Sequence, residues 1–171
     1  MPKSIVMQAM TGQDLRIFMR QMPSPVVVVT ASAQDEVRGM TVGSFTSVSL
    51  DPPLIGFNVT KHTRMHQILL EATHFAVHLL AYAQAGVATH FASVREAGAA
   101  QFAQLPHHEH ESGIPILEET LGVLICKPFA FHEAGDSVVV LGEVQAVEMG
   151  KSAPPLLYYH RQYQTLKTTL D

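Results

Sequence analysis

Apolar runs of strand-like composition recur along this chain and are separated by short polar turns. The β-branched run Val26 to Ala31 predicts a buried strand, and a hairpin follows because Gln34-Asp35-Glu36 forms a polar turn before Val37 to Met40. Between Ser44 and Leu50, apolar residues alternate with hydroxylic ones until Asp51-Pro52-Pro53 ends the run. These patterns predict three consecutive strands.

The remaining periodicities predict four more strands and three helices. The strands are Leu54 to Val59, Phe75 to Leu80, Leu121 to Phe131 and Ser137 to Glu148. The helices are Thr11 to Met22, which Thr11 and Asp14 can cap, Thr63 to Ala72, and Gln84 to Phe91. Ser93 to Leu117 is rich in Gly, Ala, Pro and His, which indicates an irregular loop with a short helix, and Pro154-Pro155 begins a closing segment.

This order of elements predicts a mainly β fold in a single domain. Six or seven strands with short hairpins and few helices are typical of a small antiparallel barrel with helices packed outside it. Residues 1–171 contain no internal repeat and no linker that would divide them, and no G-x-G-x-x-G motif follows a first strand. A nucleotide-like cofactor would therefore bind through something other than a Rossmann turn.

The composition describes a globular chain with few charges. Of the 171 residues, 47% are hydrophobic and 15% are charged, which predicts one well-buried core. Because so few charges are left to cover the surface, we also expect a homo-oligomer. The formal net charge is −4 and the 11 Lys and Arg residues are scattered, which argues against nucleic-acid binding.

The sequence also bears on compartment and thiol chemistry. The N-terminal residues lack the apolar run of a signal peptide, and no stretch approaches the ~20 apolar residues that span a membrane. We therefore expect a soluble, cytoplasmic protein without a membrane partner. Cys126 is the only cysteine and lies in the apolar run LGVLICKPFAF, so we expect a buried apolar residue and no intramolecular disulfide.

A histidine-rich stretch is the sharpest competing signal. His107-His108-Glu109-His110-Glu111 offers five side chains of the kind that bind zinc, nickel or copper. The spacing is not H-E-x-x-H, however, and Pro106 before it and Gly113 and Pro115 after it indicate an irregular loop. We therefore expect a solvated loop tip and no functional metal.

Hydroxyl groups cluster between Arg38 and Pro53. Five of them fall within nine residues, next to Gly39 and Gly43: Thr41, Ser44, Thr46, Ser47 and Ser49. Two interpretations fit this cluster. It is either an edge strand whose Ser and Thr side chains face water, or a surface where small residues let a flat polar ligand approach the backbone and bond through its heteroatoms.

A resemblance favours the second interpretation. Gly39-Met40-Thr41, followed by Ser44-Phe45-Thr46-Ser47-Val48-Ser49-Leu50-Asp51-Pro52-Pro53, resembles the signature of the flavin reductase family. These split-barrel, flavin-binding proteins include the reductase components of two-component monooxygenases. The likeness continues through Leu141-Gly142-Glu143-Val144 and the closing Pro155 to Tyr159. Arg64-Met65-His66 is similar to the styrene monooxygenase reductase branch.

The resemblance implies FMN or FAD as the cofactor, NAD(P)H as the hydride donor, and a homodimer that supplies reduced flavin to a partner monooxygenase. It places Met40, Thr41, Val42, Gly43 and Ser44 along the flavin ring, and Ser47, Val48 and Ser49 near the ribityl chain and phosphate. It also places Lys61, His62, Thr63 and Arg64 at the phosphate, and His90 and Phe91 on a helix that reaches the cofactor.

One departure from the family pattern concerns the nicotinamide. Many members have Gly-Asp-His before the strand that reads Gly-Glu-Val, whereas this chain has Gly135-Asp136-Ser137. The other candidates for the nicotinamide side are His132, Tyr159, Arg161 and Tyr163. The missing histidine leaves a second interpretation open, a flavin-binding electron carrier without reductase activity. Split-barrel families that oxidise pyridoxamine phosphate or bind haem fit the run from Ser44 to Pro53 less well.

Overall fold

The fold is built around one antiparallel sheet of seven strands. The structure, a computed structural model, describes residues 9–93 and 98–166. The strand order is β3-β2-β6-β9-β10-β5-β4, and all neighbours pair antiparallel. The bounds are β2 Val27–Ala33, β3 Glu36–Val42, β4 Thr46–Leu50, β5 Pro53–Thr60, β6 Phe75–Leu79, β9 Gly122–Ala134 and β10 Ser137–Met149. The prediction of a mainly β, antiparallel fold is confirmed.

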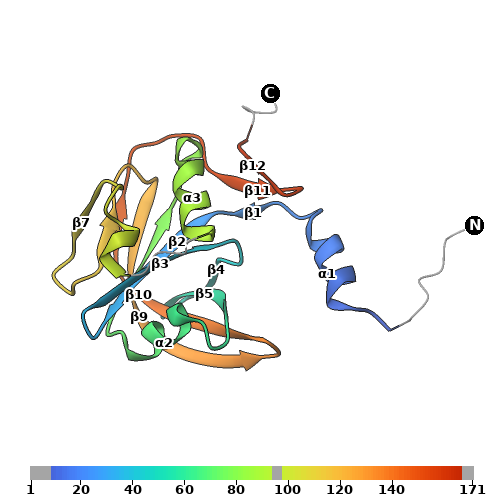
Figure 1. Ribbon diagram of the computed structural model, residues 1–171, viewed down its shortest axis with the longest axis horizontal. Helices are drawn as coiled ribbons and strands as arrows, with labels where there is room; N and C mark the ends of the chain where they lie inside the picture. The colour runs from blue at the N-terminus through green and yellow to red at the C-terminus, as the bar shows by residue number, and fades with distance from the viewer. Residues whose placement is uncertain (1–8, 94–97, 167–171) are drawn as a thin grey trace, which may run out of the picture.

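Shorter elements surround this sheet (Figure 1). The helices are α1 Gly12–Met19, α2 Arg64–Glu71 and α3 Ala85–Ala92, with the 3-10 turns η1 Tyr82–Gln84 and η2 Gly98–Gln101. A three-stranded sheet joins β1 Ser24–Pro25 to β11 Leu157–Tyr159 and β12 Gln162–Gln164, and β7 His107–Glu109 pairs with β8 Pro115–Leu117. Among the described residues, no helix has the length and apolar character needed to cross a membrane.

The two outer strands of the large sheet are neighbours along the chain. β3 lies at one end of the strand order and β4 at the other, yet only residues 43–45 join them. Three residues span at most about 10 Å, so the sheet must curl until its outer strands approach each other. We call residues 43–45 the seam, because they bridge the gap at which the barrel stays open. The backbone N–H of Asn58 in β5 donates to Ser44 Oγ at 2.9 Å and ties the seam to the far side of the gap.

The sheet is buried on both faces where β2 runs through it. Val27 and Val29 point into the barrel, where α2 closes the core with Leu69. Val28 points the other way, into a second core that contains Phe91 of α3. A strand buried on both faces needs apolar residues at every position, which explains the unbroken valine run in the sequence.

Two predicted segments need correction. The region from Ser93 to Leu117, expected to be largely irregular, contains the β7–β8 hairpin in addition to η2. The exposed residues of β7 show no apolar alternation, so the pairing depends on packing of the buried β8 against the sheet. The strand expected from Ser44 begins only at Thr46, because residues 43–45 form the seam that joins β3 to β4. It also has a β-bulge at Val48.

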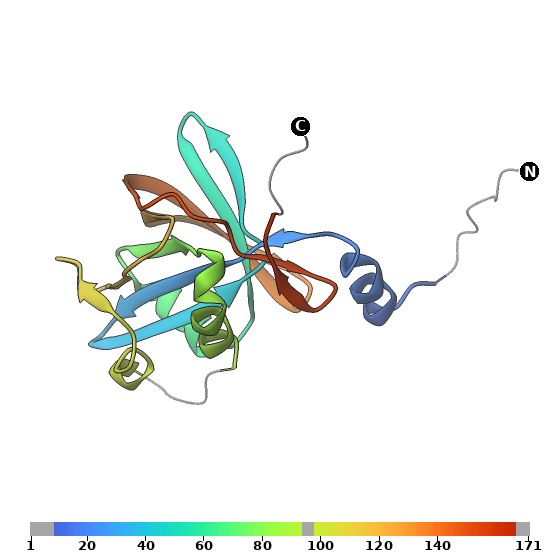
Figure 2. The same cartoon turned by 90° about the horizontal axis from the view of Figure 1, so that it is seen from above.

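Helix α1 projects from the barrel, as Figure 2 shows. The expected capping box is present, since Thr11 Oγ1 accepts from the Asp14 N–H and the Asp14 carboxylate accepts from the Thr11 N–H. The helix ends at Met19, earlier than expected, and none of its residues is buried. Leu15 and Phe18 are 61% and 70% exposed, so the apolar stripe of this helix has no partner in the described part of the chain.

Two titratable side chains are buried in the sheet. His78 on β6 is 0% exposed; its Nδ1 lies 3.0 Å from the Val28 carbonyl, while its Nε2 has no partner among the described residues. Burial lowers the pKa of His78 to about 4, so the ring is neutral at pH 7. Cys126 is buried, as expected, and burial raises the pKa of its thiol to about 12.

His78 predicts an acid-labile contribution to stability. The unfolded ring takes a proton near pH 6.5, whereas the folded ring does so only near pH 4, so the free energy of unfolding falls as the pH drops through this window. Between pH 7 and 5 the wild type should lose about 2 kcal/mol more than His78→Gln, which keeps a donor for Val28 but does not titrate. Urea unfolding at both pH values measures this difference.

The exposed His132 supplies the matched control. His132→Gln should keep the pH dependence of the wild type, because its ring is exposed in the fold. If His78→Gln lost stability with falling pH as steeply as the wild type, the buried neutral ring would not be the cause.

Candidate functional site

The seam presents free backbone donors at the surface of the barrel. Residues 43–45 belong to no strand, and their N–H groups make no hydrogen bond to any described residue. Gly43 and Ser44 are exposed, and Gly43 has no side chain to obstruct an approaching ligand. N–H groups in such a position can bond to the acceptors of a flat polar ligand. The segment Met40 to Ser44, predicted to follow the flavin ring, thus ends in available donors.

The side chains of this segment are largely occupied elsewhere. Met40 and Val42 pack into the barrel core. Thr41 points to the opposite face, where its Oγ1 donates to the Ala88 carbonyl of α3 at 2.7 Å. Because that proton is in use, the donors of this segment that have no partner among the described residues include the N–H groups of Gly43 and Ser44 and the Ser44 hydroxyl.

The hydroxyls of β4 are more accessible. Ser47 is exposed, and its Oγ has no hydrogen-bond partner among the described residues. Ser49 Oγ accepts from the Asp51 N–H at 3.3 Å and can still donate its own proton. Val48 is half exposed at the bulge, where it covers Gly56 of β5. Their placement near the ribityl chain and phosphate stays a prediction.

Both cations predicted to face the cofactor phosphate are paired with carboxylates. Arg64 Nε donates to the two carboxylate oxygens of Glu36 at 2.9 and 2.8 Å, and Lys61 Nζ donates to Glu133 at 2.9 Å. These hydrogen bonds are the main cause that lowers the pKa of Glu36 and of Glu133. A phosphate at this loop would have to compete with the two carboxylates for the cations.

The rest of the loop is shaped by the start of α2. Thr63 Oγ1 donates to the Thr60 carbonyl at 2.8 Å and accepts from the His66 N–H at 3.3 Å, so its hydroxyl serves as the helix N-cap. The His62 N–H donates to His66 Nδ1 at 3.3 Å. Thr60 lies two residues, roughly 7 Å, beyond the Asn58 that meets the seam. The fold therefore brings this loop close to the seam.

The closing hairpin places three of the predicted nicotinamide-side residues beside the seam. A cavity of about 470 Å³ between α1, the β11–β12 hairpin and the seam is lined by Gly43, Ser44, Tyr159 and Arg161, among others. A smaller one of about 220 Å³ connects Gly43 with Tyr163. We call the larger one the arginine cavity.

Two further arginines line the arginine cavity with Arg161: Arg16 of α1 and Arg20, the residue that caps the end of this helix. None of the three forms an ion pair with a carboxylate of the described residues. The His160 N–H donates to the Arg20 carbonyl at 3.3 Å, and its ring lies 3.2 Å from Gln21 Oε1, which holds the end of α1 against the hairpin. No sequence pattern points to Arg16 or Arg20, because only the fold brings α1 to residues 158–161.

Ser137 and His132 lie on the other side of the seam. Ser137 starts β10 opposite Thr60, and its Oγ donates to Asp136 Oδ1 at 3.0 Å. His132 is exposed on β9 opposite Val139, whose other neighbour is Asn58. The five nicotinamide-side candidates thus form two groups, one on each side of the seam.

Helix α3, predicted to reach the cofactor, packs against β3 just before the seam. Phe91 is 4% exposed, because its ring lies against Gly39 and 5.3 Å from the ring of Phe102. Phe91 thus supports β3, and its predicted contact with the cofactor stays a prediction. His90 is half-buried, and its Nε2 lies 2.8 Å from the Gln101 carbonyl.

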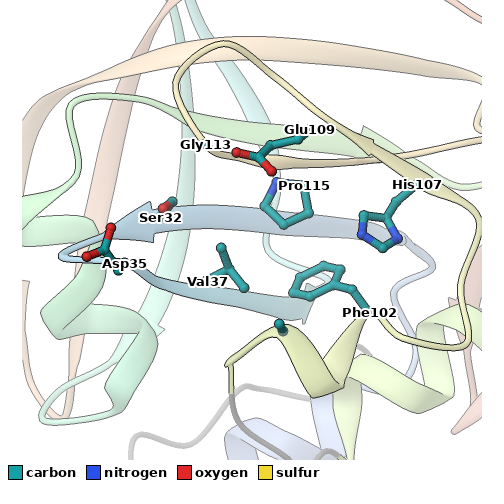
Figure 3. Close-up of a pocket in the computed structure, with 9 residues that line it drawn as sticks. Ser32, Asp35, Val37, Phe102, His107, Glu109, Gly113 and Pro115 are labelled. Carbon is teal, nitrogen blue, oxygen red and sulfur yellow. The ribbon is translucent and has the colours of Figure 1, made fainter.

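A separate cavity of about 310 Å³ lies at the other end of β3 (Figure 3). His107 and Glu109 both line it, but Figure 3 shows Pro115 between the imidazole and the carboxylate. Among the described residues, no three His, Cys, Asp or Glu side chains gather closely enough to hold a metal ion. That the histidine-rich stretch has no functional metal stays a prediction.

These features define a class of protein, an open antiparallel barrel whose seam has backbone donors without partners among the described residues, beside a cavity lined by arginines. The family model described as "Flavin reductase like domain" matches residues 19–167. The chain belongs to the flavin reductase family.

Its relatives cover most of the chain. It is 40% identical over 136 residues to the FMN reductase (NADH) SmoA of Agrobacterium fabrum, which spans 78% of this chain and 76% of that one. It is 37% identical over 143 residues to the 4-hydroxyphenylacetate 3-monooxygenase reductase component of Thermus thermophilus, 84% of this chain and 89% of that one. The solved NADH:FAD oxidoreductase SgcE6 of Streptomyces globisporus, in complex with NAD and FAD fragments, has a TM-score of 0.85 at 34% identity and covers 93% of this chain and 94% of that one.

The close approach of α3 to β3 predicts opposite effects for two glycines. A Cβ at Gly39 would lie 2.3 Å from Phe91 Cε1, so Gly39→Ala should destabilise the fold by about 1–3 kcal/mol through overpacking. Gly86, in α3 itself, has nothing within 4 Å of its Cβ position, and Gly86→Ala should stabilise by about 0.5–1 kcal/mol. Thermal unfolding measures both. A Gly39→Ala variant as stable as the wild type would contradict this packing.

Proposed function

We propose that this chain is an NAD(P)H-dependent flavin reductase that transfers a hydride from the nicotinamide to FMN or FAD. The seam carries this proposal, because exposed and unpaired N–H groups follow directly on the glycine-rich part of the family signature. The relatives are named as NADH-dependent reductases of FMN or FAD. When bound, the flavin supplies the ring that accepts the hydride and releases the electrons later.

The residues of the chain orient the ring and stabilise charge. The N–H groups of residues 43–45, which have no partner among the described residues, would donate to the polar edge of the ring, where negative charge grows on reduction. Met40 and Val42, anchored in the core, keep that backbone in place. Hydride transfer itself requires proximity and orientation of two rings, so no side chain has to act as an acid or base.

The arginine cavity suits the nicotinamide dinucleotide. Its volume of about 470 Å³ lies in the range of small-molecule sites. Arg16, Arg20 and Arg161 offer guanidinium groups to the phosphates, and Tyr159 offers a flat surface. Gly43 also lines the cavity, so a dinucleotide held there would reach the ring at the seam.

The electron-carrier alternative rests on Ser137, which replaces the histidine of many family members. Ser137 does not line the arginine cavity. The substitution therefore leaves the arginine and tyrosine side of the site intact, which favours the reductase over the carrier.

The reduced flavin that this reaction forms needs a second protein that uses it. Several relatives are named as reductase components of monooxygenases, including those for 4-hydroxyphenylacetate and resorcinol. We therefore expect the reduced flavin to leave this chain for a partner monooxygenase by diffusion, and we expect both proteins in the cytoplasm.

An assay of nicotinamide consumption distinguishes a flavin reductase from a flavin-binding electron carrier. Purified protein mixed with FMN or FAD and then with NADH or NADPH should consume the nicotinamide steadily, as read by absorbance. Arg161→Ala should raise the KM for the nicotinamide by about tenfold or more, since a hydrogen bond to a charged group contributes about 1.5–3 kcal/mol. Arg38→Ala, on β3 and outside the arginine cavity, is the control and should leave that KM unchanged. Flavin binding without turnover would identify the carrier, and no flavin binding would reject both functions.

We further propose that the chain is a homodimer in which α1 packs on the second copy. Apolar residues of α1 are largely exposed, with Leu15 at 61% and Phe18 at 70%, and the helix projects from its own barrel. An apolar stripe with this exposure is typical of an interface. A self-complementary surface is the usual arrangement for a soluble protein of this size.

Charge on the apolar face of α1 should break this dimer. Phe18→Glu combined with Leu15→Glu removes two apolar side chains that the dimer would bury, and should raise the dimer dissociation constant by about 100-fold or more. Gln13→Glu adds one charge at a polar position of the same helix and should leave the dimer intact. Sedimentation velocity distinguishes the species. A monomeric wild type, or a dimer that survives both substitutions, would contradict the assignment.

A further inference from the structure

Strand β3 pairs with β2 on one edge, and a glutamine side chain covers part of its other edge. The Gly39 N–H donates to Gln101 Oε1 at 2.9 Å, and Gln101 Nε2 donates to the Gly39 carbonyl at 3.3 Å. A side-chain amide has a donor and an acceptor in one plane, as a peptide group does, so Gln101 pairs with Gly39 as a neighbouring strand would. Gln101 is 1% exposed, so both bonds are made away from water.

The glutamine is itself held in place. Its backbone carbonyl lies 2.8 Å from His90 Nε2 of α3, which ties the end of η2 to that helix. The same helix contacts β3 at two further points, since Phe91 covers Gly39 and the Thr41 hydroxyl donates to the Ala88 carbonyl. Helix α3 and turn η2 therefore contact β3 at residues 39 and 41 and hold it in place.

Gly39 and Thr41 lie just before the seam in the chain. Met40 lies between them, and residues 43–45 follow after Val42. The backbone N–H groups of the seam make no bonds of their own to the described residues, so their position depends on the strand that enters the seam. The position of β3 is fixed by β2 on one edge and by Gln101 on the other.

We propose that Gln101 is a positioning residue for flavin reduction: its amide takes the place of a strand partner at Gly39 and so aims the seam N–H groups at the flavin ring. The inference rests on the proposed function, because the flavin must lie at the seam. Loss of the amide leaves a buried donor and a buried acceptor without partners, which the edge of β3 can satisfy only by shifting or by admitting water. A shift there moves the donors that the ring needs.

The primary test compares two glutamines. Gln101→Leu removes the amide at nearly constant size, and Gln104→Leu makes the same change at an exposed position three residues later. We expect the Kd for FMN or FAD, measured by quenching of flavin fluorescence, to rise at least tenfold in Gln101→Leu and less than twofold in Gln104→Leu. We also expect kcat to fall while the KM for the nicotinamide stays within twofold, because the arginine cavity does not include Gln101.

Gln101→Glu provides a readout that general loss of stability would not produce. Burial raises the pKa of the introduced carboxyl group. In its protonated form this group again offers one donor and one acceptor to Gly39, whereas the ionised form lacks the donor. Flavin affinity of the variant, relative to the wild type, should therefore fall as the pH rises from about 5 to 8. The titratable side chain that adjoins this position is His90, whose Nε2 lies 2.8 Å from the Gln101 carbonyl.

The outcomes separate this inference from the proposed function. A wild type that binds no flavin rejects the proposed function and the inference with it. A wild type that binds flavin, with a folded Gln101→Leu variant of unchanged Kd, rejects the inference alone. If Gln101→Leu does not fold, a pH-independent affinity ratio between Gln101→Glu and the wild type rejects it in the same way.

Discussion

The three residues between β3 and β4 impose the constraint on which the rest of this structure depends. They must join the first and last strands of a seven-stranded sheet, and their reach of about 10 Å compels the sheet to curl into a barrel. The outer strands come close enough for the Asn58 N–H to reach Ser44 Oγ, but the backbone of the seam itself stays unpaired. The unpaired donors of the proposed binding surface are thus a consequence of how the sheet closes.

Because the backbone N–H groups of the seam make no hydrogen bond to the described residues, the seam requires support from its neighbours. Core packing of Met40 and Val42 holds one face of β3, and α3 holds the other through Phe91 and Thr41. Only a glycine at position 39 lets the aromatic ring come so close. The N–H groups of the seam can remain free because packing of the side chains before it holds the strand in place.

The charges around the seam are distributed unevenly. On the side of β5 the cations Lys61 and Arg64 are already neutralised by Glu133 and Glu36. On the side of the closing hairpin Arg16, Arg20 and Arg161 have no carboxylate partner among the described residues. An anionic ligand therefore meets more available charge at the hairpin than at the loop before α2. The dinucleotide and the flavin phosphate need not use the same group of cations.

The sequence by itself determined much of the local structure, and it predicted where the proposed site lies. Unbroken valines in β2, the capping residues of α1 and the signature from Gly39 to Pro53 are short-range patterns, and they predicted the strands, the helix start and the flavin-binding segment. The tertiary structure alone decided how distant residues meet. Gln101 covers β3, Arg16 and Arg20 approach Arg161, and Arg64 pairs with Glu36 because strand order and barrel closure bring them together. Such contacts leave no periodic trace in the chain, since each depends on the packing of elements that are far apart in sequence.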